Sequence, residues 1–319
     1  MRKLVRSVLA VALAGVAFSA FPAEKLDMSK KLVVGFPQID ENQPWRWAES
    51  ESFKSEAANY NVELKYVNCE DSQANQIKAL RSFIAQGVDA IILPPRVETG
   101  WDPVLKEAKK AKIPVILVDR GIKTSDPALY VTLLASDFVF EGEQAAKWLA
   151  KATNGKANIV ELQGSTGAAP AIDRKKGFEA GIKSYPDMKI IKSQDGNWTP
   201  AGGKELTEAF LKAEGKNINA VFAHNDGMAL GAIQAIEEAG MTPGKDILIV
   251  SIDGIKEAFQ AMIDGKLNCT VECTPLLGAP AYKALRRHLA GEKLPKWIKS
   301  EDQTFTMDQA AQVIGTRKY

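Results

Sequence analysis

An apolar run in the first half of the chain ends abruptly in an acid and a base. Residues Ile113–Val118 are followed by Asp119, Arg120 and Gly121. Because the run is apolar on both faces, it is typical of a strand inside a parallel sheet that helices cover. Ligands bind beyond the carboxyl ends of such strands. The carboxylate accepts hydrogen bonds and the guanidinium donates them, so the pair could hold a polyhydroxylated ligand or could form a plain salt bridge at the strand end.

Polar and aromatic side chains follow several other expected strands in the same manner. They are Asn42, Gln43, Trp45 and Arg46 after the first strand, Arg174, Trp198, Asn225 and Asp253 in the second half of the chain, and Glu272 on a returning strand. Taken singly, Asn225 and Asp253 could cap helices. The two tryptophans could be core aromatics, and Arg174 could be a surface helix residue. Taken together, they predict one cleft with the composition of a sugar site, where aromatic faces stack on C–H surfaces and polar groups divide the hydroxyls.

Alternating strand-like and helix-like segments must position these residues. Expected strands are 31–36, 62–67, 90–93, 113–118, 128–134, 159–162, 189–192, 220–223, 247–252 and 267–273. Expected helices are 45–59, 73–86, 103–111, 137–153, 171–183, 202–213, 227–238, 256–263 and 275–289. Each helix returns the chain to add another parallel strand, so the pattern predicts an α/β fold with two similar doubly wound parallel-sheet lobes.

The order of these segments predicts where the chain passes between the lobes. The N-terminal lobe is expected to comprise residues 24–134 plus 274–304, and the C-terminal lobe residues 135–273 plus 305–319. The pattern starts afresh between Leu134 and Asp137, and the tail after Pro295 has little pattern of its own. A chain that crosses more than once between two lobes makes a hinge rather than a loose linker.

The first 23 residues have the composition of an export signal. Residues 1–6 are basic, residues 8–17 are apolar and alanine-rich, and small residues between Ser19 and Ala23 allow cleavage. The apolar run is too short to span a bilayer. We therefore expect a mature protein in the periplasm. The net charge of +2 becomes −1 without the three bases of this segment, which is no electrostatic footprint for nucleic acid.

The cysteines and histidines predict neither a disulfide nor a metal site. Cys269 and Cys273 fall in one expected strand, where four residues separate the Cα atoms by ~13 Å, whereas a disulfide needs less than ~7 Å. With Cys69, these make three thiols without neighbouring histidines, a poor zinc site. We expect inert thiols, structural roles for His224 and His288, and no cofactor.

In combination, eight segments resemble those of a known family. They are Gln73–Ala79, Ala85–Ile91, Thr99–Trp101, Pro114–Arg120, Val160–Gly164, Ala171–Phe178, Ala223–Asp226 and Ser251–Gly254. The chain resembles the periplasmic sugar-binding proteins of ABC transporters, of the ribose-binding type, and is most similar within them to the galactofuranose-binding members. The resemblance covers nearly the whole chain after the signal. It implies the periplasmic binding protein type I fold, a monosaccharide ligand bound as a furanose, an ABC permease in the inner membrane as partner, and a monomer without enzymatic activity.

The resemblance also implies roles for individual residues. Asp119 and Arg120 match the family's Asp–Arg pair that grips sugar oxygens. The other matching positions are Arg174 as the second-lobe arginine, Asn225 as the amide, Asp253 as the carboxylate, and Trp45 and Trp198 as the aromatics. Arg46 stands where ribose binders have a second aromatic, and Glu272 where they have a hinge glutamine. The loop Ile39–Pro44 is more acidic than the corresponding loop expected in the galactofuranose binders, which leaves the exact sugar open.

Three alternatives differ in class from a transport protein. A sugar-processing enzyme could use the cleft acids, but each sits beside an arginine or an amide, and we expect Arg120 and Arg174 to lie near Asp119 and Asp253 and keep them ionised. The segment Gly164–Gly167 is neither a nucleophile elbow nor a P-loop. A DNA repressor core would need a helix-turn-helix where the export signal stands. A sugar sensor that serves a signalling receptor remains open.

Overall fold

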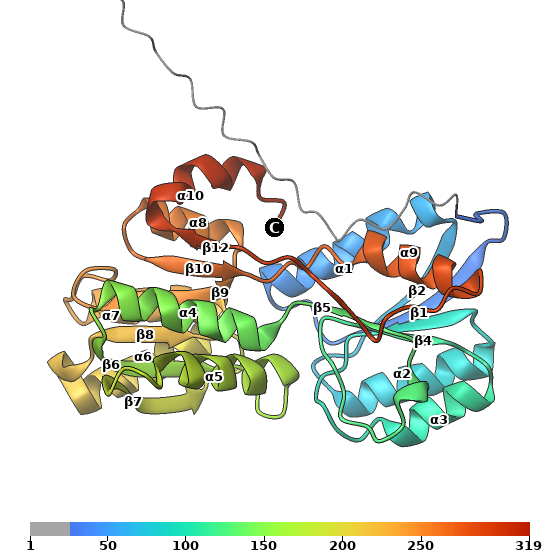
Figure 1. The fold of residues 1–319 in the computed structure, drawn as a ribbon, viewed down its shortest axis with the longest axis horizontal. Coiled ribbons are helices and arrows are strands. Elements are labelled where there is room, and N and C mark those ends of the chain that lie inside the picture. The colour runs from blue at the N-terminus through green and yellow to red at the C-terminus, as the bar shows by residue number, and fades with distance from the viewer. Residues whose placement is uncertain (1–25) are drawn as a thin grey trace, which may run out of the picture.

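Two α/β lobes lie side by side along the long axis of the molecule, with three chain segments running between them (Figure 1). This computed structural model describes residues 26–319. The expected export signal lies outside the described residues. Each lobe is built on a sheet of six strands. The prediction of two doubly wound parallel-sheet lobes is therefore confirmed.

The first sheet has the order β11-β5-β4-β3-β1-β2, and all of its strand pairs are parallel. Its strands are β1 (Leu32–Gln38), β2 (Val62–Asn68), β3 (Ala90–Leu93), β4 (Val115–Val118), β5 (Leu133–Ala135) and β11 (Trp297–Lys299). Helices α1 (Pro44–Glu56) and α9 (Gly278–Leu289) pack on one face, and α2 (Gln73–Gln86) and α3 (Asp102–Lys110) pack on the other. The all-apolar strands β3 and β4 are fully buried because helices cover both faces.

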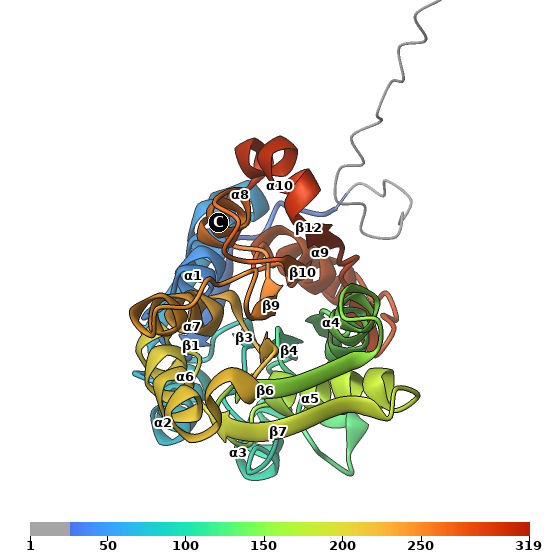
Figure 2. The same cartoon turned by 90° about the vertical axis from the view of Figure 1, so that its left-hand side faces the viewer.

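The second sheet repeats this order as β12-β10-β9-β8-β6-β7, except that β12 runs antiparallel to β10. Its strands are β6 (Lys156–Gln163), β7 (Asp187–Asp195), β8 (Ala220–Ala223), β9 (Leu248–Asp253), β10 (Cys269–Glu272) and β12 (Thr304–Thr306). Its helices are α4 (Phe138–Ala152), α5 (Ala169–Ile182), α6 (Pro200–Glu214), α7 (Asp226–Glu238), α8 (Lys256–Ile263) and α10 (Met307–Val313). Seen end-on, α6 and α7 lie on one side of the sheet and α4 and α5 on the other (Figure 2).

Local signals set the ends of the helices. Ser72 caps α2 by accepting from the Asn75 amide, and Asp137 caps α4 by accepting from the Phe140 amide. Helices α4 and α5 pack closely because Gly177 has no side chain: a Cβ there would lie 2.0 Å from the carbonyl oxygen of Val139.

Two sequence expectations fail at short elements. Residues 128–134 do not form one strand, because a 3-10 turn covers Pro127–Leu129 and β5 begins only at Leu133. Asp126 caps that turn by accepting from the Ala128 amide, and Pro127 cannot donate to a strand neighbour. The weakly patterned tail contains β11, β12, α10 and a final 3-10 turn at Ile314–Thr316.

The chain passes between the lobes after β5, after β10, and between β11 and β12. The proposed division at 134/135, 273/274 and 304/305 follows these crossings, although Ala135 still belongs to β5 and Thr304 already to β12. Three separate chain segments that pass between the lobes suit a hinge. No helix within residues 26–319 is long and apolar enough to cross a membrane.

Candidate ligand-binding site

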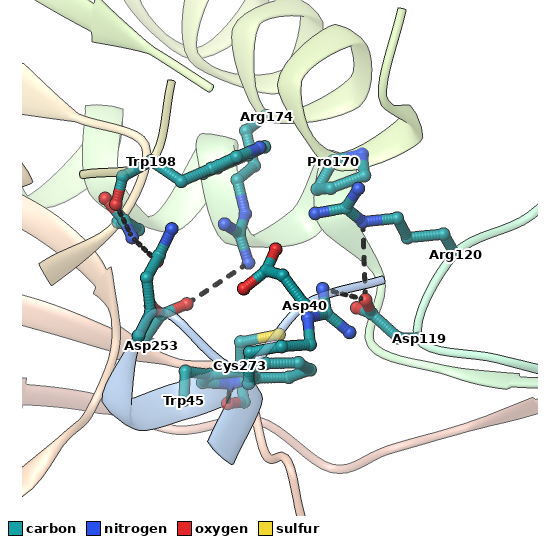
Figure 3. A pocket seen from close by; sticks show the side chains of 12 residues that line it. Asp40, Trp45, Asp119, Arg120, Pro170, Arg174, Trp198, Asp253 and Cys273 are labelled. Atoms are coloured by element: carbon teal, nitrogen blue, oxygen red, sulfur yellow. Dashed lines mark hydrogen bonds and ion pairs between the residues drawn. The ribbon is translucent and has the colours of Figure 1, made fainter. Parts of the chain in front are cut away.

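A pocket lies between the lobes, at the edge of each sheet where the strands end (Figure 3). It is lined by Asp40, Gln43, Trp45, Arg46, Asp119, Arg120, Pro170, Arg174, Trp198, Asn225, Asp253 and Cys273. In the first lobe they come from the loop after β1, the start of α1 and the end of β4; in the second they come from α5 and from the ends of β7, β8, β9 and β10. The carboxyl ends of parallel strands are where open α/β sheets bind ligands.

Asp119 turns the chain sharply at the end of β4. Its φ of +60° lies in the left-handed region, which aspartate tolerates better than branched residues do. The turn directs its carboxylate into the pocket, where Oδ2 accepts a hydrogen bond from Arg46 Nη2 at 2.8 Å and lies 3.3 Å from Arg120 Nε. Asp119 is thus both a salt-bridge residue and a pocket residue, so the two readings of the sequence are compatible.

Arg46 joins this acid to a deeper one. Its Nη1 donates to Glu49 Oε2 at 2.5 Å, and both side chains are buried. Burial lowers the pKa of Arg46, but Glu49 and Asp119 outweigh it and raise that pKa above its usual value. The guanidinium carbon also lies 4.7 Å from the ring centroid of Trp45. Arg46 therefore stays charged and fixed in place.

Arg120 is less well satisfied. Its Nη1 donates to the carbonyl of Arg96 at 3.0 Å, but its buried Nε has no hydrogen-bond partner among the described residues. Burial, and then the nearby charge of Arg46, lower the pKa of Arg120 to about 10. Among the described residues, its only charged neighbour at this atom is Asp119 Oδ2, at 3.3 Å and without a hydrogen bond, so Arg120 would gain from an acceptor oxygen on a ligand.

Trp45 ties the first lobe to the second crossing. Its Nε1 donates to the carbonyl oxygen of Cys273 at 2.6 Å, and its ring packs with the core of the second lobe. Only 7% of Trp45 is exposed. Trp45 therefore lines the pocket and is also a core aromatic at the seam.

Trp198 stands on a strained turn after β7. Asn197 and Trp198 have φ values of +56° and +64°, which are rare for residues with side chains. The ring lies against Gly164, where a Cβ would come within 1.9 Å of Trp198 Cζ2. Its Nε1 has no partner among the described residues, and its ring centroid lies 5.5 Å from Arg120 Cζ. Strain of this kind, held by surrounding contacts, is common at ligand sites.

His224 supports this turn from beneath. Its Nδ1 accepts from the Gly164 amide at 3.3 Å, so Nε2 carries the proton and donates to Glu161 Oε1 at 3.1 Å. Burial lowers the pKa of His224, in keeping with a neutral ring. Burial raises the pKa of Glu161, but hydrogen bonds from His224, Lys175 and Ser193 outweigh it and lower that pKa to about 2. The expected structural role of His224 agrees with this geometry.

Arg174 and Asp253 form a looser pair in the second lobe. Arg174 donates to Glu141 Oε2 at 2.7 Å and to the carbonyl of His224 at 2.6 Å, whereas its Nη2 lies 3.7 Å from Asp253 Oδ1. Burial raises the pKa of Asp253 well above its usual value, more than the charge of Arg174 lowers it. Arg174 thus lowers the pKa of Asp253, as expected, but at 3.7 Å it offsets only part of the effect of burial.

The turn that presents Asp253 is held by a second buried acid. Asp226 accepts hydrogen bonds from Ser251 and Thr270 and from the amides of Gly254 and Ile255, at 2.5 to 2.9 Å. Burial raises the pKa of Asp226 to about 6 despite these donors. Asp226 thus fixes the backbone behind Asp253.

Asn225 combines capping with a contact across the cleft. Its Oδ1 accepts from the Met228 amide at 3.0 Å and caps α7. Its Nδ2 donates to the carbonyl of Trp198 at 3.0 Å and to Gln43 Oε1, in the other lobe, at 3.1 Å. The closed arrangement of the lobes therefore includes a direct hydrogen bond between two predicted site residues.

The pocket gathers nine of the eleven predicted site residues and leaves out two. Asn42 is exposed. Glu272 lies at the end of β10, where its Oε1 pairs with Arg317 Nη1 at 2.7 Å, so its carboxylate is held by the tail. The pocket also includes Asp40, Pro170 and Cys273, which were not predicted. Only Asp40 had a signal, the unusually acidic loop after the first strand.

The described residues contain no candidate metal site. No group of three or more histidine, cysteine, aspartate or glutamate side chains within residues 26–319 could hold a metal ion. Cys69, Cys269 and Cys273 are buried free thiols, as expected. Burial raises the pKa of all three, which keeps them protonated.

The fold and this interlobe pocket define a class of protein. The chain belongs to the periplasmic binding protein family, because a family model described as a periplasmic binding protein domain matches residues 34–293. The chain is 48% identical, over 97% of its length and 95% of the relative's, to the galactofuranose-binding protein YtfQ of Escherichia coli (strain K12). The resemblance inferred from the eight segments is thereby confirmed.

Two solved structures share the fold at similar identity. One is the periplasmic binding protein component of the arabinose ABC transporter from Shewanella sp. ANA-3, bound to α- and β-L-arabinofuranose; it is 52% identical, with a TM-score of 0.88, covering 90% of this chain and 95% of that one. The other, from Mycobacterium smegmatis in complex with β-D-fucofuranose, is 47% identical, with a TM-score of 0.87 and the same coverage.

Proposed function

We propose that this protein is an exported, non-catalytic binding protein that captures a monosaccharide as its furanose and delivers it to an ABC permease in the inner membrane. The ligand occupies the pocket between the lobes, and the lobes close around it by bending at the three crossings. The observation that carries the proposal is the pocket itself. Two tryptophans, three arginines and three aspartates from both lobes converge there.

The unpaired groups of this pocket suit a sugar. Trp198 Nε1 is a buried donor without a partner among the described residues, and Arg120 Nε faces Asp119 at 3.3 Å without a hydrogen bond; both would pair with ring or hydroxyl oxygens. The Asp253 carboxyl has only Arg174 at 3.7 Å and would pair with a hydroxyl. The faces of Trp45 and Trp198 would cover the C–H surfaces.

The similar proteins support a furanose over a pyranose. The relative in Escherichia coli is named for galactofuranose, and the two solved structures hold arabinofuranose and fucofuranose. The Trp45–Arg46 pair and the Asp119–Arg120 pair both line the pocket of this chain, and we assign to them the binding of a furanose. The composition of residues 1–23, which is that expected of an export signal, supports a periplasmic location.

A ligand-induced melting shift tests the proposal, since a ligand that binds the native state raises apparent stability. The screen uses D-galactose, L-arabinose, D-fucose, D-ribose and D-fructose, followed by calorimetric titration of those that shift the melting temperature. Methyl furanosides and methyl pyranosides of the same sugars separate the two ring forms. Incubation with a methyl furanoside, followed by assay for free sugar, tests for turnover.

We expect a melting shift with at least one furanose, no shift with the matched pyranoside, and no turnover. The control is Asp119→Ala, which loses its ion pairs with Arg46 and Arg120 and should melt at a lower temperature, but should remain folded and lose most of the sugar-induced shift. Release of free sugar would point to an enzyme, and a pyranoside-only response would overturn the ring assignment.

A further inference from the structure

Asp40 lines the pocket but was not among the predicted site residues. Asp40 lies two positions past the end of β1, and its carboxylate points into the middle of the pocket (Figure 3). Its Oδ1 accepts the amide of Asn42 at 2.9 Å, which fixes the loop and aims the side chain. Among the described residues, no group donates to its Oδ2, so this oxygen can accept from a ligand.

Asp40 differs in this respect from the other acid of the first lobe. Asp119 accepts directly from Arg46 at 2.8 Å and lies 3.3 Å from Arg120. Asp40 forms no ion pair within residues 26–319, although its charge helps to raise the pKa values of Arg46 and Arg96 and opposes the lowering of the pKa of Arg120. Its charge therefore acts on the arginines only from a distance, while its Oδ2 stays open to the pocket.

The charges around Asp40 are already balanced by other acids. Arg46 pairs with Glu49 and Asp119, and Arg174 pairs with Glu141. Asp40 thus adds a negative charge where no cation is left fully unpaired. A ligand with its own negative charge would meet this carboxylate in a site shielded from water, which is unfavourable.

We propose that Asp40 is a specificity-determining residue, which accepts a hydrogen bond from a hydroxyl of a neutral sugar and rejects acidic sugars. The inference rests on the proposed sugar-binding function. It assigns to this chain a preference for uncharged polyhydroxylated ligands over uronates. The rejection comes from like charges, and the selection comes from an acceptor that only a donor can satisfy.

Asp40→Asn tests both halves. Asparagine has nearly the same shape and keeps an oxygen for the Asn42 amide, so the loop is preserved while the free acceptor becomes a donor. Calorimetric titration compares D-galactose with D-galacturonate on the wild type and on the variant. We expect galactose to bind about 10-fold more weakly to the variant, and the preference for galactose over galacturonate to fall at least about 10-fold.

A set of monodeoxy galactoses identifies the partner hydroxyl. Removal of that hydroxyl should weaken binding to the wild type by about 10-fold and leave binding to Asp40→Asn nearly unchanged, as a double-mutant cycle requires for a direct contact. Asp40→Ser, which shortens the side chain, should give the same pattern and guards against a local rearrangement in Asp40→Asn.

Glu41→Gln is the matched control, because it removes one negative charge from the next residue of the same loop. Glu41 pairs with Lys54 and lies outside the pocket. It should leave both affinities unchanged. Equal galactose affinity and equal discrimination in wild type and Asp40→Asn would overturn the role of Asp40 alone. Failure of the wild type to bind any sugar of the melting screen would overturn the proposed function and this inference together.

Discussion

Each lobe contributes aspartate, arginine and tryptophan side chains to the pocket, but the two lobes differ in how far these groups are already hydrogen-bonded. In the first lobe, Asp119 is paired with Arg46 at 2.8 Å, and the indole N–H of Trp45 is hydrogen-bonded at 2.6 Å. In the second lobe, Asp253 lies 3.7 Å from its arginine, and the indole N–H of Trp198 has no partner among the described residues. Apart from Arg120, whose Nε lacks a hydrogen bond to any described residue, these first-lobe groups are already satisfied without a ligand, whereas the second lobe has more to gain from one.

This difference suggests a division of labour. The first-lobe face is a rigid platform because its charges hold each other. The second-lobe face has polar groups without close partners, so the closed state becomes favourable only when a ligand pairs with them. A ligand can shift a conformational equilibrium only by its differential affinity for the two states, and the unpaired groups of the second lobe supply that difference.

The largest expected effect separates the two acids in the ligand-free protein. Asp119→Asn should lower the free energy of unfolding by about 3 kcal/mol, because it leaves the buried Arg46 and Arg120 without this carboxylate. Asp253→Asn should leave that free energy unchanged or raise it, because burial already disfavours its charge. Chemical denaturation of both variants measures the contrast. Equal losses would show that the two faces are equivalent after all.

The next effect concerns the strained turn in the second lobe. Gly164→Ala places a Cβ within 1.9 Å of the Trp198 ring and must displace it, so sugar affinity should fall by at least about 30-fold, or ~2 kcal/mol. Gly121→Ala is the matched control, because its Cβ would meet only Leu133 Cδ2 at 3.5 Å, an ordinary contact. Titration calorimetry reports the affinities, and wild-type binding by Gly164→Ala would mean that Trp198 is not a ligand contact.

The tryptophans should then differ in a smaller way. Trp45→Phe leaves the buried carbonyl of Cys273 without its donor and should cost about 1.5 kcal/mol of unfolding free energy. Trp198→Phe breaks no hydrogen bond of the ligand-free protein and should cost less. The sugar-induced change in fluorescence should instead depend mainly on Trp198. The same loss of stability in both variants would argue against the contrast between the lobes.

The smallest effect lies at the seam between the lobes. Burial and the nearby Glu141 and Glu272 raise the pKa of Asp302 to about 8, although Ser136 donates to it and Arg174 opposes the shift. Because the folded-state pKa is raised, this group destabilises the fold progressively as pH rises from about 4 through 8. Asp302→Asn should therefore raise the melting temperature at pH 8.5 by about 2–4 °C and change it little at pH 4. A shift of equal size at both pH values would contradict this titration.

Much of the fold was readable from the sequence because the strands are strongly apolar. Strands β3 and β8 and helices α2 and α8 have the predicted bounds, since apolar runs and clear breaks mark their ends. The three-residue strands β11 and β12 carry too few residues to show a period. The failed strand at 128–134 shows the same limit, because Asp126 and Pro127 favour a turn that apolar neighbours conceal.

The pocket was less fully readable, for a different reason. Residues at the ends of long strands, such as Asp119 and Asp253, could be placed because their strands could be. The position of Glu272 against Arg317 could not, because its partner lies in the unpatterned tail. Asp40 needed the loop conformation set by the Asn42 amide, which no periodicity records. The pKa of Asp253 depends on burial and on a distance that only the structure supplies.

The third crossing has a consequence for how the protein is made. Strands β11 and β12 are the outermost strands of the two sheets, and residues 300–303 alone join them. Until β11 has emerged from the ribosome or the export channel, β5 remains an open edge, and until β12 has emerged, β10 does; open edges are prone to pair with other chains. The last strands of the two sheets are therefore made one after the other, so neither sheet is complete until most of the other has been made. A protease cut between β11 and β12 would leave β11 attached to the rest of the chain, but β12 and α10 would be held to the second lobe by non-covalent contacts alone.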